Sequence, residues 1–170
     1  MTIRSIPLLL LFACALCPPT AYAVERLGDA TYVYELGRHA DAVTALERDY
    51  LSLIESAPRE ERFDLYRNYD RLMGTWRQVD FLQTLLDVAV DATARPDEEA
   101  IRSALRDHAQ YVLWELDSAI AGLEEDSLEP RRSTYLEVDT GCRSLLANVR
   151  ATIDRLLVDH CAAAACAVRP

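Results

Sequence analysis

The chain contains no lysine, because all 18 of its basic residues are arginine. This absence excludes chemistry that needs a lysine amine, such as Schiff-base formation or the phosphate-binding lysine of a P-loop. Glycine and proline are also scarce, with 5 and 7 copies among 170 residues. Most of them stand where the periodic segments stop. So few turn-forming residues favour a chain built from a small number of long elements.

The N-terminal residues have the three parts of a secretory signal peptide. Arg4 gives a positive start, residues 6–16 form an apolar run, and Ala21 and Ala23 frame an A-x-A cleavage site. The run is too short to span a bilayer, and no later segment offers about 18 uninterrupted apolar residues. A rival reading is a lipid anchor at Cys14, although bulky Phe12 suits a lipobox poorly. We therefore expect a signal peptide over residues 1–23, a domain over 24–170, and a periplasmic or secreted protein.

The expected mature chain, residues 24–170, lacks the common catalytic and cofactor motifs. It contains no H-E-x-x-H, G-x-S-x-G, C-x-x-C or G-x-G-x-x-G sequence, and the Glu-x-x-His pairs of di-iron bundles are missing. Its three cysteines, Cys142, Cys161 and Cys166, form an odd set, so at least one stays free or pairs between chains. We predict no cofactor and expect that the protein is not an enzyme.

Acidic residues dominate the charge: 28 Asp and Glu give a net charge of −10 at pH 7. Such a surface repels the phosphates of nucleic acids and the headgroups of anionic lipids. Neither is expected as a partner. A protein partner or a second copy of the chain remains open.

Four segments show the 3.6-residue apolar period of amphipathic helices, and none shows the alternation of a strand. Helices are predicted over residues 29–56, 59–93, 97–126 and 133–167. Asp29 is the expected N-cap of the first helix, and Pro58 stands before the first turn of the second. A break in the fourth helix is expected near Thr140-Gly141. Short connections between helices of similar length favour antiparallel neighbours. The prediction is an all-α, up-down-up-down four-helix bundle. The alternative is a three-helix coiled coil with the first helix detached.

The apolar residues of each helix form a seam for the common core. In the second helix, Gln83 is the single polar residue of the predicted seam, where it would fix register through a buried hydrogen bond. The seams comprise Leu36, His39, Val43, Leu46, Tyr50, Leu53 and Ala57; Leu65, Tyr69, Leu72, Trp76, Val79, Gln83, Leu86 and Val90; Ile101, Leu105, Ala109, Val112, Leu116, Ala119 and Leu123; and Cys142, Leu146, Val149, Ile153, Leu156, His160 and Ala163.

The three histidines are the candidate metal ligands. His39 and His160 lie in seams and His108 flanks one, and helix lengths place His39 and His108 in one layer of the bundle. Converging imidazoles would bind Zn, Cu or Ni, and one histidine with Met73 could ligate a haem. The alternative is that each histidine hydrogen-bonds a neighbour at the edge of the core.

Apolar surface that the seams leave unused marks a candidate interface. Phe81, Leu85 and Val88 point away from the core side of the second helix, and Tyr111 and Trp114 lie on the outer face of the third. A helix that is apolar all round is normally covered. Residues 24–34 of the same chain could cover this surface, as could a protein partner or a second copy, or an apolar ligand could occupy a slot inside the bundle.

The sequence therefore favours an exported, non-catalytic bundle that acts in protein–protein interaction or ligand sensing. A metal- or haem-binding bundle using His39, His108 and His160 is the second hypothesis. A small enzyme without a recognisable motif is the third.

Overall fold

Four α-helices account for almost all of the described chain. The computed structural model describes the backbone of residues 20–91, 98–127 and 133–167, and the side chains of 30–91, 98–126 and 134–159. The helices are α1 (Thr20–Ser56), α2 (Arg62–Asp91), α3 (Glu98–Ser127) and α4 (Ser133–Ala167). The described residues include no strand. The prediction of an all-α protein with four helices is confirmed.

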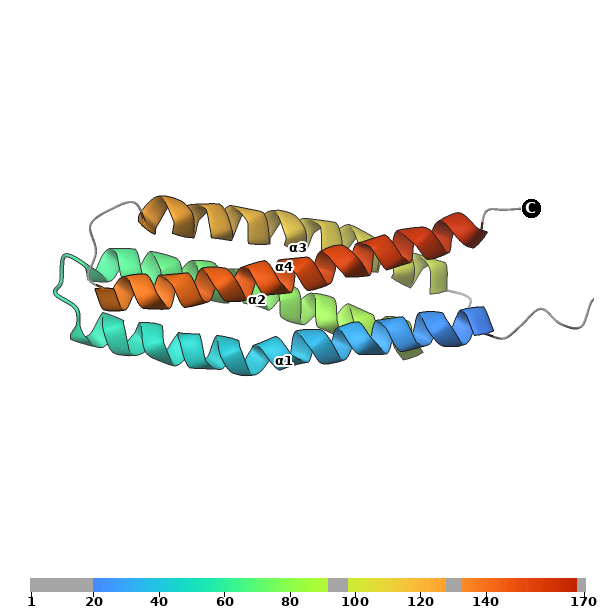
Figure 1. Cartoon of the computed structure of the whole chain (residues 1–170), viewed down its shortest axis with the longest axis horizontal. Helices are drawn as coiled ribbons and strands as arrows, with labels where there is room; N and C mark the ends of the chain where they lie inside the picture. The colour runs from blue at the N-terminus through green and yellow to red at the C-terminus, as the bar shows by residue number, and fades with distance from the viewer. Residues whose placement is uncertain (1–19, 92–97, 128–132, 168–170) are drawn as a thin grey trace, which may run out of the picture.

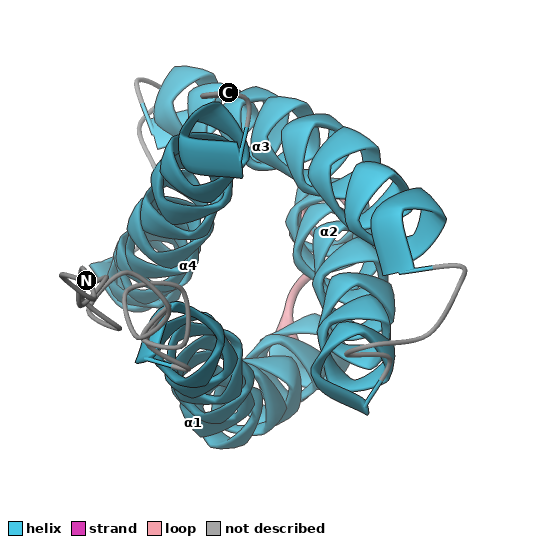
Figure 2. Ribbon diagram, turned by 90° about the vertical axis from the view of Figure 1, so that its right-hand side faces the viewer, coloured by secondary structure: helices cyan, strands magenta, loops and turns pink. Residues whose placement is uncertain are grey.

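The helices form a closed ring in which each packs against the helices on either side of it, and α2 also meets α4 across the ring (Figure 2). Contacts join α1 to α2, α2 to α3, α3 to α4 and α4 back to α1, whereas α1 and α3 lie diagonally opposite and do not touch. The end of α1, the start of α2, the end of α3 and the start of α4 gather at one end of the elongated molecule (Figure 1). Because α1 packs on both α2 and α4, the alternative with a detached first helix is wrong.

One large apolar cluster fills the interior along the length of the ring. Leu36, Leu72, Leu116 and Ile153, one from each helix, belong to this cluster and have no exposed surface. Burying a leucine or isoleucine side chain contributes roughly 1.5–3 kcal/mol relative to leaving it in water. The shared burial of these four seams is the main term that holds the helices together.

The predicted seam of α2 is half wrong. Leu65, Leu72, Val79 and Leu86 are buried as expected, but the alternate row is shifted by one residue. Asn68, Thr75, Leu82 and Ala89 are buried in place of Tyr69, Trp76, Gln83 and Val90. The larger rings of Tyr69 and Trp76 pack at the edge of the core, where the Tyr69 hydroxyl reaches Glu47 at 3.2 Å. The buried polar residue of this seam is Asn68 rather than Gln83.

Two helix starts and one predicted break differ from the predictions. α1 begins at Thr20 rather than at Asp29, because the residues 20–28 include only one glycine and otherwise tolerate a helix. Pro58 lies in a turn closed by the Glu61 N–H donating to its carbonyl at 3.0 Å, so α2 begins only at Arg62. α4 runs through Gly141 without a break.

No helix in the described part of the chain has the length and apolar content that crossing a membrane requires.

Candidate functional site

Four aromatic side chains form a continuous row on the outer surface of α2 and α3. The ring of Phe81 from α2 meets the edge of His108 from α3, with centroids 4.7 Å apart and planes at 87°. The row continues along α3, with 5.9 Å between the centroids of His108 and Tyr111 and 6.1 Å between those of Tyr111 and Trp114. Such centroid distances are those of favourable aromatic pairs. These four side chains are called the aromatic row below.

Helix geometry explains why the three α3 members of the row align. Residues 108, 111 and 114 follow one another at intervals of three, so each is a neighbour of the next on the helix surface. The row turns from the α2 side of α3 toward its exposed face. On the α2 side, His108 is held by its Nε2, which lies 3.1 Å from the backbone carbonyl oxygen of Gln78. A carbonyl oxygen only accepts hydrogen bonds, so Nε2 carries the proton. This bond and the Phe81 contact fix the imidazole between the two helices.

The row is largely exposed to solvent. Phe81, Tyr111 and Trp114 keep 51%, 44% and 64% of their surface accessible, and Val88, two turns after Phe81 on α2, keeps 42%. Of the five residues proposed as an interface, Leu85 alone is not exposed, because it packs against the core cluster. His108 belongs to the row although the sequence marked it as a metal ligand. Its spacing of three residues from Tyr111 was the signal that could have placed it there.

The N-terminal segment 24–34 packs elsewhere, as far as its side chains are described. Tyr32 is buried, and its hydroxyl donates a hydrogen bond to Asp159 of α4. Tyr34 is exposed, and α1 makes no contact with α3. The side chains of residues 24–29 lie outside the described part. The row is therefore not covered by residues 30–34.

The predicted metal ligands lie on different sides of the bundle. His39 lines a groove between α1 and α4, whereas His108 lies between α2 and α3. His160 falls outside the described side chains. Among the described residues, no group of three or more His, Cys, Asp or Glu side chains could hold a metal ion. The three-histidine site stays a prediction of the sequence.

The groove that contains His39 is polar and shallow, with a volume of about 400 Å³. Arg155 Nη2 of α4 donates to Glu35 Oε2 of α1 at 2.6 Å and to Thr152 Oγ1 of its own helix at 3.2 Å. Burial lowers the pKa of His39, and neighbouring Arg38 lowers it further. The lowered pKa favours the neutral imidazole at pH 7. Because Arg155 is paired with Glu35, the unpaired positive charge of the groove lies on Arg38. Asn148 and Ala151 complete the lining.

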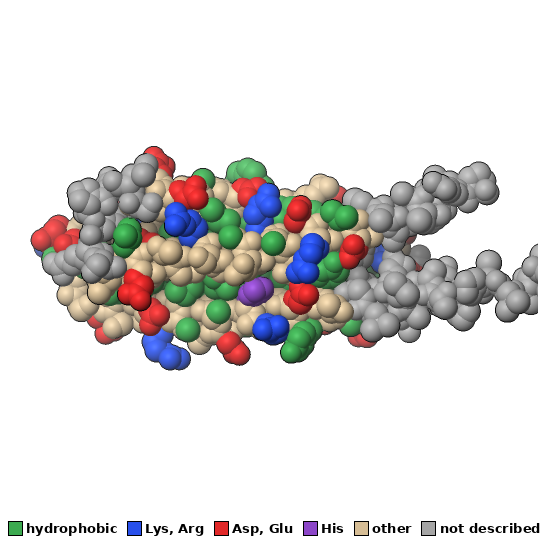
Figure 3. Space-filling view, in the orientation of Figure 1, with side chains coloured by type: hydrophobic (Ala, Val, Ile, Leu, Met, Phe, Trp, Pro, Cys, Tyr) green, Lys and Arg blue, Asp and Glu red, His purple; other side chains and the backbone are tan. Residues whose placement is uncertain are grey.

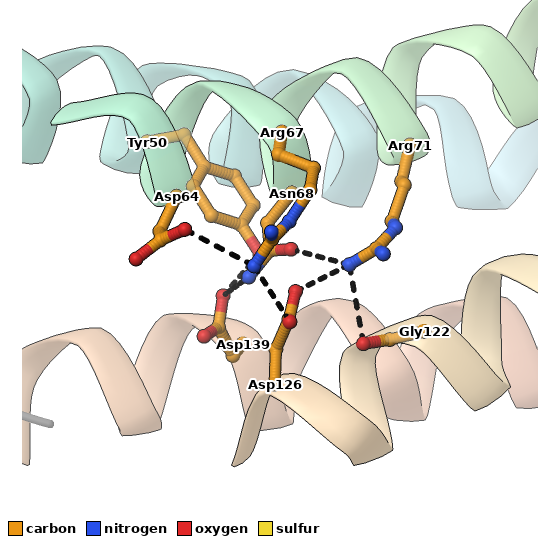
Figure 4. Close-up of polar contacts among 8 residues, drawn as sticks. All are labelled: Tyr50, Asp64, Arg67, Asn68, Arg71, Gly122, Asp126 and Asp139. Atoms are coloured by element: carbon orange, nitrogen blue, oxygen red, sulfur yellow. Dashed lines mark hydrogen bonds and ion pairs between the residues drawn. The ribbon is translucent and has the colours of Figure 1, made fainter. Parts of the chain in front are cut away.

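A buried polar cluster ties α1, α2 and α4 together near the end of the bundle (Figure 4). Asp139 of α4 accepts hydrogen bonds at Oδ1 from the Tyr50 hydroxyl at 2.7 Å and from the Asn68 amide at 3.1 Å. All three side chains are buried. A buried carboxylate needs such donors, because an unpaired charge in the interior costs several kcal/mol.

The cluster extends to α3 through two arginines of α2. The Asn68 side-chain oxygen accepts from Arg71 Nη1 at 2.9 Å, and the same guanidinium binds Asp126 and the Gly122 carbonyl (Figure 4). Arg67 Nη2 reaches Asp126 at 2.6 Å. A Cβ on residue 122 would lie 2.7 Å from the Arg71 guanidinium carbon, so glycine is what permits this approach. The network thus connects all four helices.

Cys142 lies beside this cluster and is protected from reaction. It is the free cysteine among the described residues and has no exposed surface. Burial raises the pKa of its thiol to about 12, and the nearby Asp139 carboxylate adds to the rise. Burial likewise raises the pKa of the Tyr50 phenol far above its usual value. Both groups are protonated at neutral pH. A thiol in this state is a poor nucleophile.

Comparison of the chain with protein-family models, with curated proteins and with solved structures finds no match.

Proposed function

We propose that this protein is an exported, non-catalytic helical bundle that binds a protein partner through the aromatic row. In this proposal residues 1–23 are a cleaved signal peptide, residues 24–170 fold as an up-down-up-down four-helix bundle, and the protein works in the periplasm or outside the cell. The leader pattern of Arg4, the apolar run and Ala21-Tyr22-Ala23 supports export.

The observation that carries the proposal is the exposure of the aromatic row. Three of its rings keep roughly half or more of their surface in water although the chain has a full apolar core. Clustered exposed apolar side chains are uncommon on monomeric proteins and mark interaction sites. Trp and Tyr are also the residue types that contribute most to binding energy at interfaces. Phe81, Tyr111 and Trp114 fit this role because they are large, rigid and adjacent.

A non-catalytic role is supported by the chemistry of the interior. The Tyr50, Asn68 and Asp139 side chains are hydrogen-bonded to one another, and the Cys142 thiol is protonated. Asp139, Tyr50 and Asn68 do not line the α1–α4 groove. Their arrangement suits a role in fixing how the four helices align, as buried polar residues do in other bundles.

The decisive experiment places a photoreactive cross-linker in the row. A photoreactive phenylalanine analogue replaces Tyr111 in one variant and Tyr66, an exposed tyrosine elsewhere on α2, in a matched control. Irradiation in the cells that make the protein should give one discrete heterologous adduct from position 111 and none from position 66. The adduct should disappear when Trp114→Ala is added. Equal adducts from both positions, or no adduct from position 111, would refute the proposal.

Ligand sensing in the α1–α4 groove is a second candidate function, and the charge of the groove favours a small anion. Arg38 forms no ion pair within the described residues, whereas Arg155, in the same lining, is paired with Glu35. Phosphate and short dicarboxylates should raise the Tm of the protein if they bind, since binding to the native state alone stabilises it. Arg38→Gln should abolish this gain. Arg77→Gln, which removes an exposed arginine of α2, should leave it unchanged. The absence of any gain would exclude this function.

A further inference from the structure

We propose that the partner of the aromatic row is cationic: an amphipathic helical segment that packs apolar side chains on the rings and places Lys or Arg over the surrounding carboxylates. This inference rests on the proposed function and specifies the chemistry of the partner.

Unpaired carboxylates adjoin the row on both helices. Asp80 precedes Phe81, and Asp107 precedes His108 and stands one turn before Tyr111. Both are exposed, and within the described residues neither forms an ion pair. Glu115 adds a third carboxylate, whose Oε1 accepts the Tyr111 hydroxyl at 2.5 Å. The surface next to the row is therefore acidic, and its exposed carboxylates can bind a cationic partner.

Few basic side chains lie near the row. Arg77, one turn before Phe81, is the nearby arginine on the same face of α2. Arg106 on α3 is engaged with Glu99 at 2.9 Å, and Arg150 holds Asp117 at 2.5 Å. On the face seen in Figure 3, acidic and basic side chains are interspersed among apolar ones. The local balance around the row thus favours binding of positive charge.

The same charges disfavour a second copy of the chain as the occupant. In a symmetric dimer the same surface meets itself. Two rows in contact would bring Asp80 and Asp107 of each copy close together, in a chain whose net charge is already −10. Like charges facing one another across an interface cost several kcal/mol. A partner of opposite charge avoids this repulsion and gains attraction.

The rings themselves also recognise cations. A guanidinium or ammonium placed over the face of a Trp or Tyr is attracted by the ring quadrupole, and Trp is the strongest acceptor. Trp114 and Tyr111 stand side by side at the most exposed end of the row. A partner helix with apolar residues at i, i+3 or i+4 and i+7 and with basic residues between them would satisfy both the rings and the carboxylates.

The test measures binding of synthetic helices to the full chain by fluorescence anisotropy. Three labelled peptides of about five helical turns share one leucine face and carry Lys, Gln or Glu on the other. The Lys peptide should bind at least about 10-fold more tightly than the Gln peptide, and the Glu peptide should bind most weakly. The affinity of the Lys peptide should fall as salt is added, because salt screens the attraction to exposed carboxylates.

Variants show whether the row is where the peptide binds. Trp114→Ala with Phe81→Ala should weaken binding of the Lys peptide by about 10-fold or more. Asp80→Asn with Asp107→Asn should weaken it by roughly 3- to 10-fold. The matched control, Asp41→Asn with Asp49→Asn on α1, removes the same charge from exposed positions away from the row and should leave binding unchanged.

Two outcomes would overturn the inference. Equal binding of the Lys, Gln and Glu peptides, lost in the Trp114→Ala variant, would show that the row binds apolar helices irrespective of charge, so the proposed function would stand without the cationic partner. Binding of the Lys peptide that is weakened equally by the α1 control would show attraction to the overall acidic surface rather than to the row.

Discussion

Asn68 and Asp139 face each other inside the bundle, with the Asn68 amide nitrogen 3.1 Å from Asp139 Oδ1, and neither side chain reaches solvent to any extent. The pair joins α2 to α4 across the end of the ring, and Tyr50 joins α1 to the same carboxylate. A helix that rotated or slid by one residue would separate these groups and leave a buried carboxylate without donors. The contact therefore selects one alignment of the helices among those that an apolar seam alone would allow.

Removing the carboxylate should destabilise the fold strongly. Asp139→Ala leaves the Tyr50 hydroxyl and the Asn68 amide buried without their acceptor, and each such loss costs about 1–3 kcal/mol. Urea unfolding should show a fall of roughly 2–4 kcal/mol in the free energy of unfolding. Asp49→Ala, at an exposed position, should change it by no more than about 0.5 kcal/mol. Equal effects of the two substitutions would show that the buried contacts do not stabilise the bundle.

The Cys142 thiol should be unreactive in the folded protein. It is buried and its pKa is raised to about 12, so it offers neither access nor thiolate at pH 8. In residues 24–170 carrying Cys161→Ser and Cys166→Ser, Cys142 is the only cysteine left. Its labelling by a thiol reagent should proceed only as fast as the protein unfolds, and urea should accelerate it. Labelling of the native protein at the rate of a small free thiol would contradict the buried position.

Tyr32 should make stability fall at alkaline pH. Burial, with the hydrogen bond to Asp159, raises the pKa of its phenol to about 12, against 10.0 for an unperturbed tyrosine. Above pH 10 the unfolded chain releases this proton while the folded protein keeps it. The contribution of Tyr32 to the free energy of unfolding is complete below pH 10. It is lost between pH 10 and 12, at up to about 1.4 kcal/mol per pH unit. Urea unfolding should show this loss relative to Tyr32→Phe, and parallel pH profiles of the two proteins would contradict it.

Zinc should bind no site shared by His39 and His108. The two side chains face different grooves, and the Nε2 proton of His108 is donated to Gln78. The Tm of wild type, His39→Gln and His108→Gln should therefore respond equally to added Zn²⁺. A gain in wild type that either substitution abolishes would restore the metal-site hypothesis.

Export can be tested at the leader. The protein from the extracytoplasmic fraction should begin at Val24, and Ala23→Phe should leave the leader attached, because signal peptidase needs a small residue at that position. Cys14→Ala should change neither the mass nor the location of the mature protein. Release of the protein from membranes by Cys14→Ala would favour the lipid anchor instead.

The sequence predicted the helices well because the apolar period of each segment is regular over many turns. Leu36, Leu116 and Ile153 were recognised as core residues from this period alone. The period failed for the alternate row of α2, where hydropathy favoured Tyr69 and Trp76 over Asn68 and Thr75. Polar residues enter a core only when partners exist, and the partner of Asn68, Asp139, lies 71 residues further along the chain.

The candidate site was predictable in part for the same reason. Exposed Trp114, Tyr111 and Phe81 were marked by their position off the seams, which is a local property of each helix. These three side chains and His108 form one row only because of the way α2 packs on α3. That packing cannot be derived from the sequence of either helix alone. The metal hypothesis treated the histidines as neighbours because their heights along the bundle matched. Height does not determine which inter-helix groove a side chain faces.

The most direct measurement of whether the aromatic row awaits a partner is the solvent access of Trp114 in the isolated protein. In a Trp76→Phe variant, which leaves Trp114 as the only tryptophan, acrylamide should quench the indole fluorescence nearly as well as that of free tryptophan, at low and at high protein concentration. Protection at every concentration would mean that the chain covers its own row. Protection that develops only at high concentration would mean that a second copy covers it. Either result would contradict the proposal that the row is free to bind a different, cationic partner.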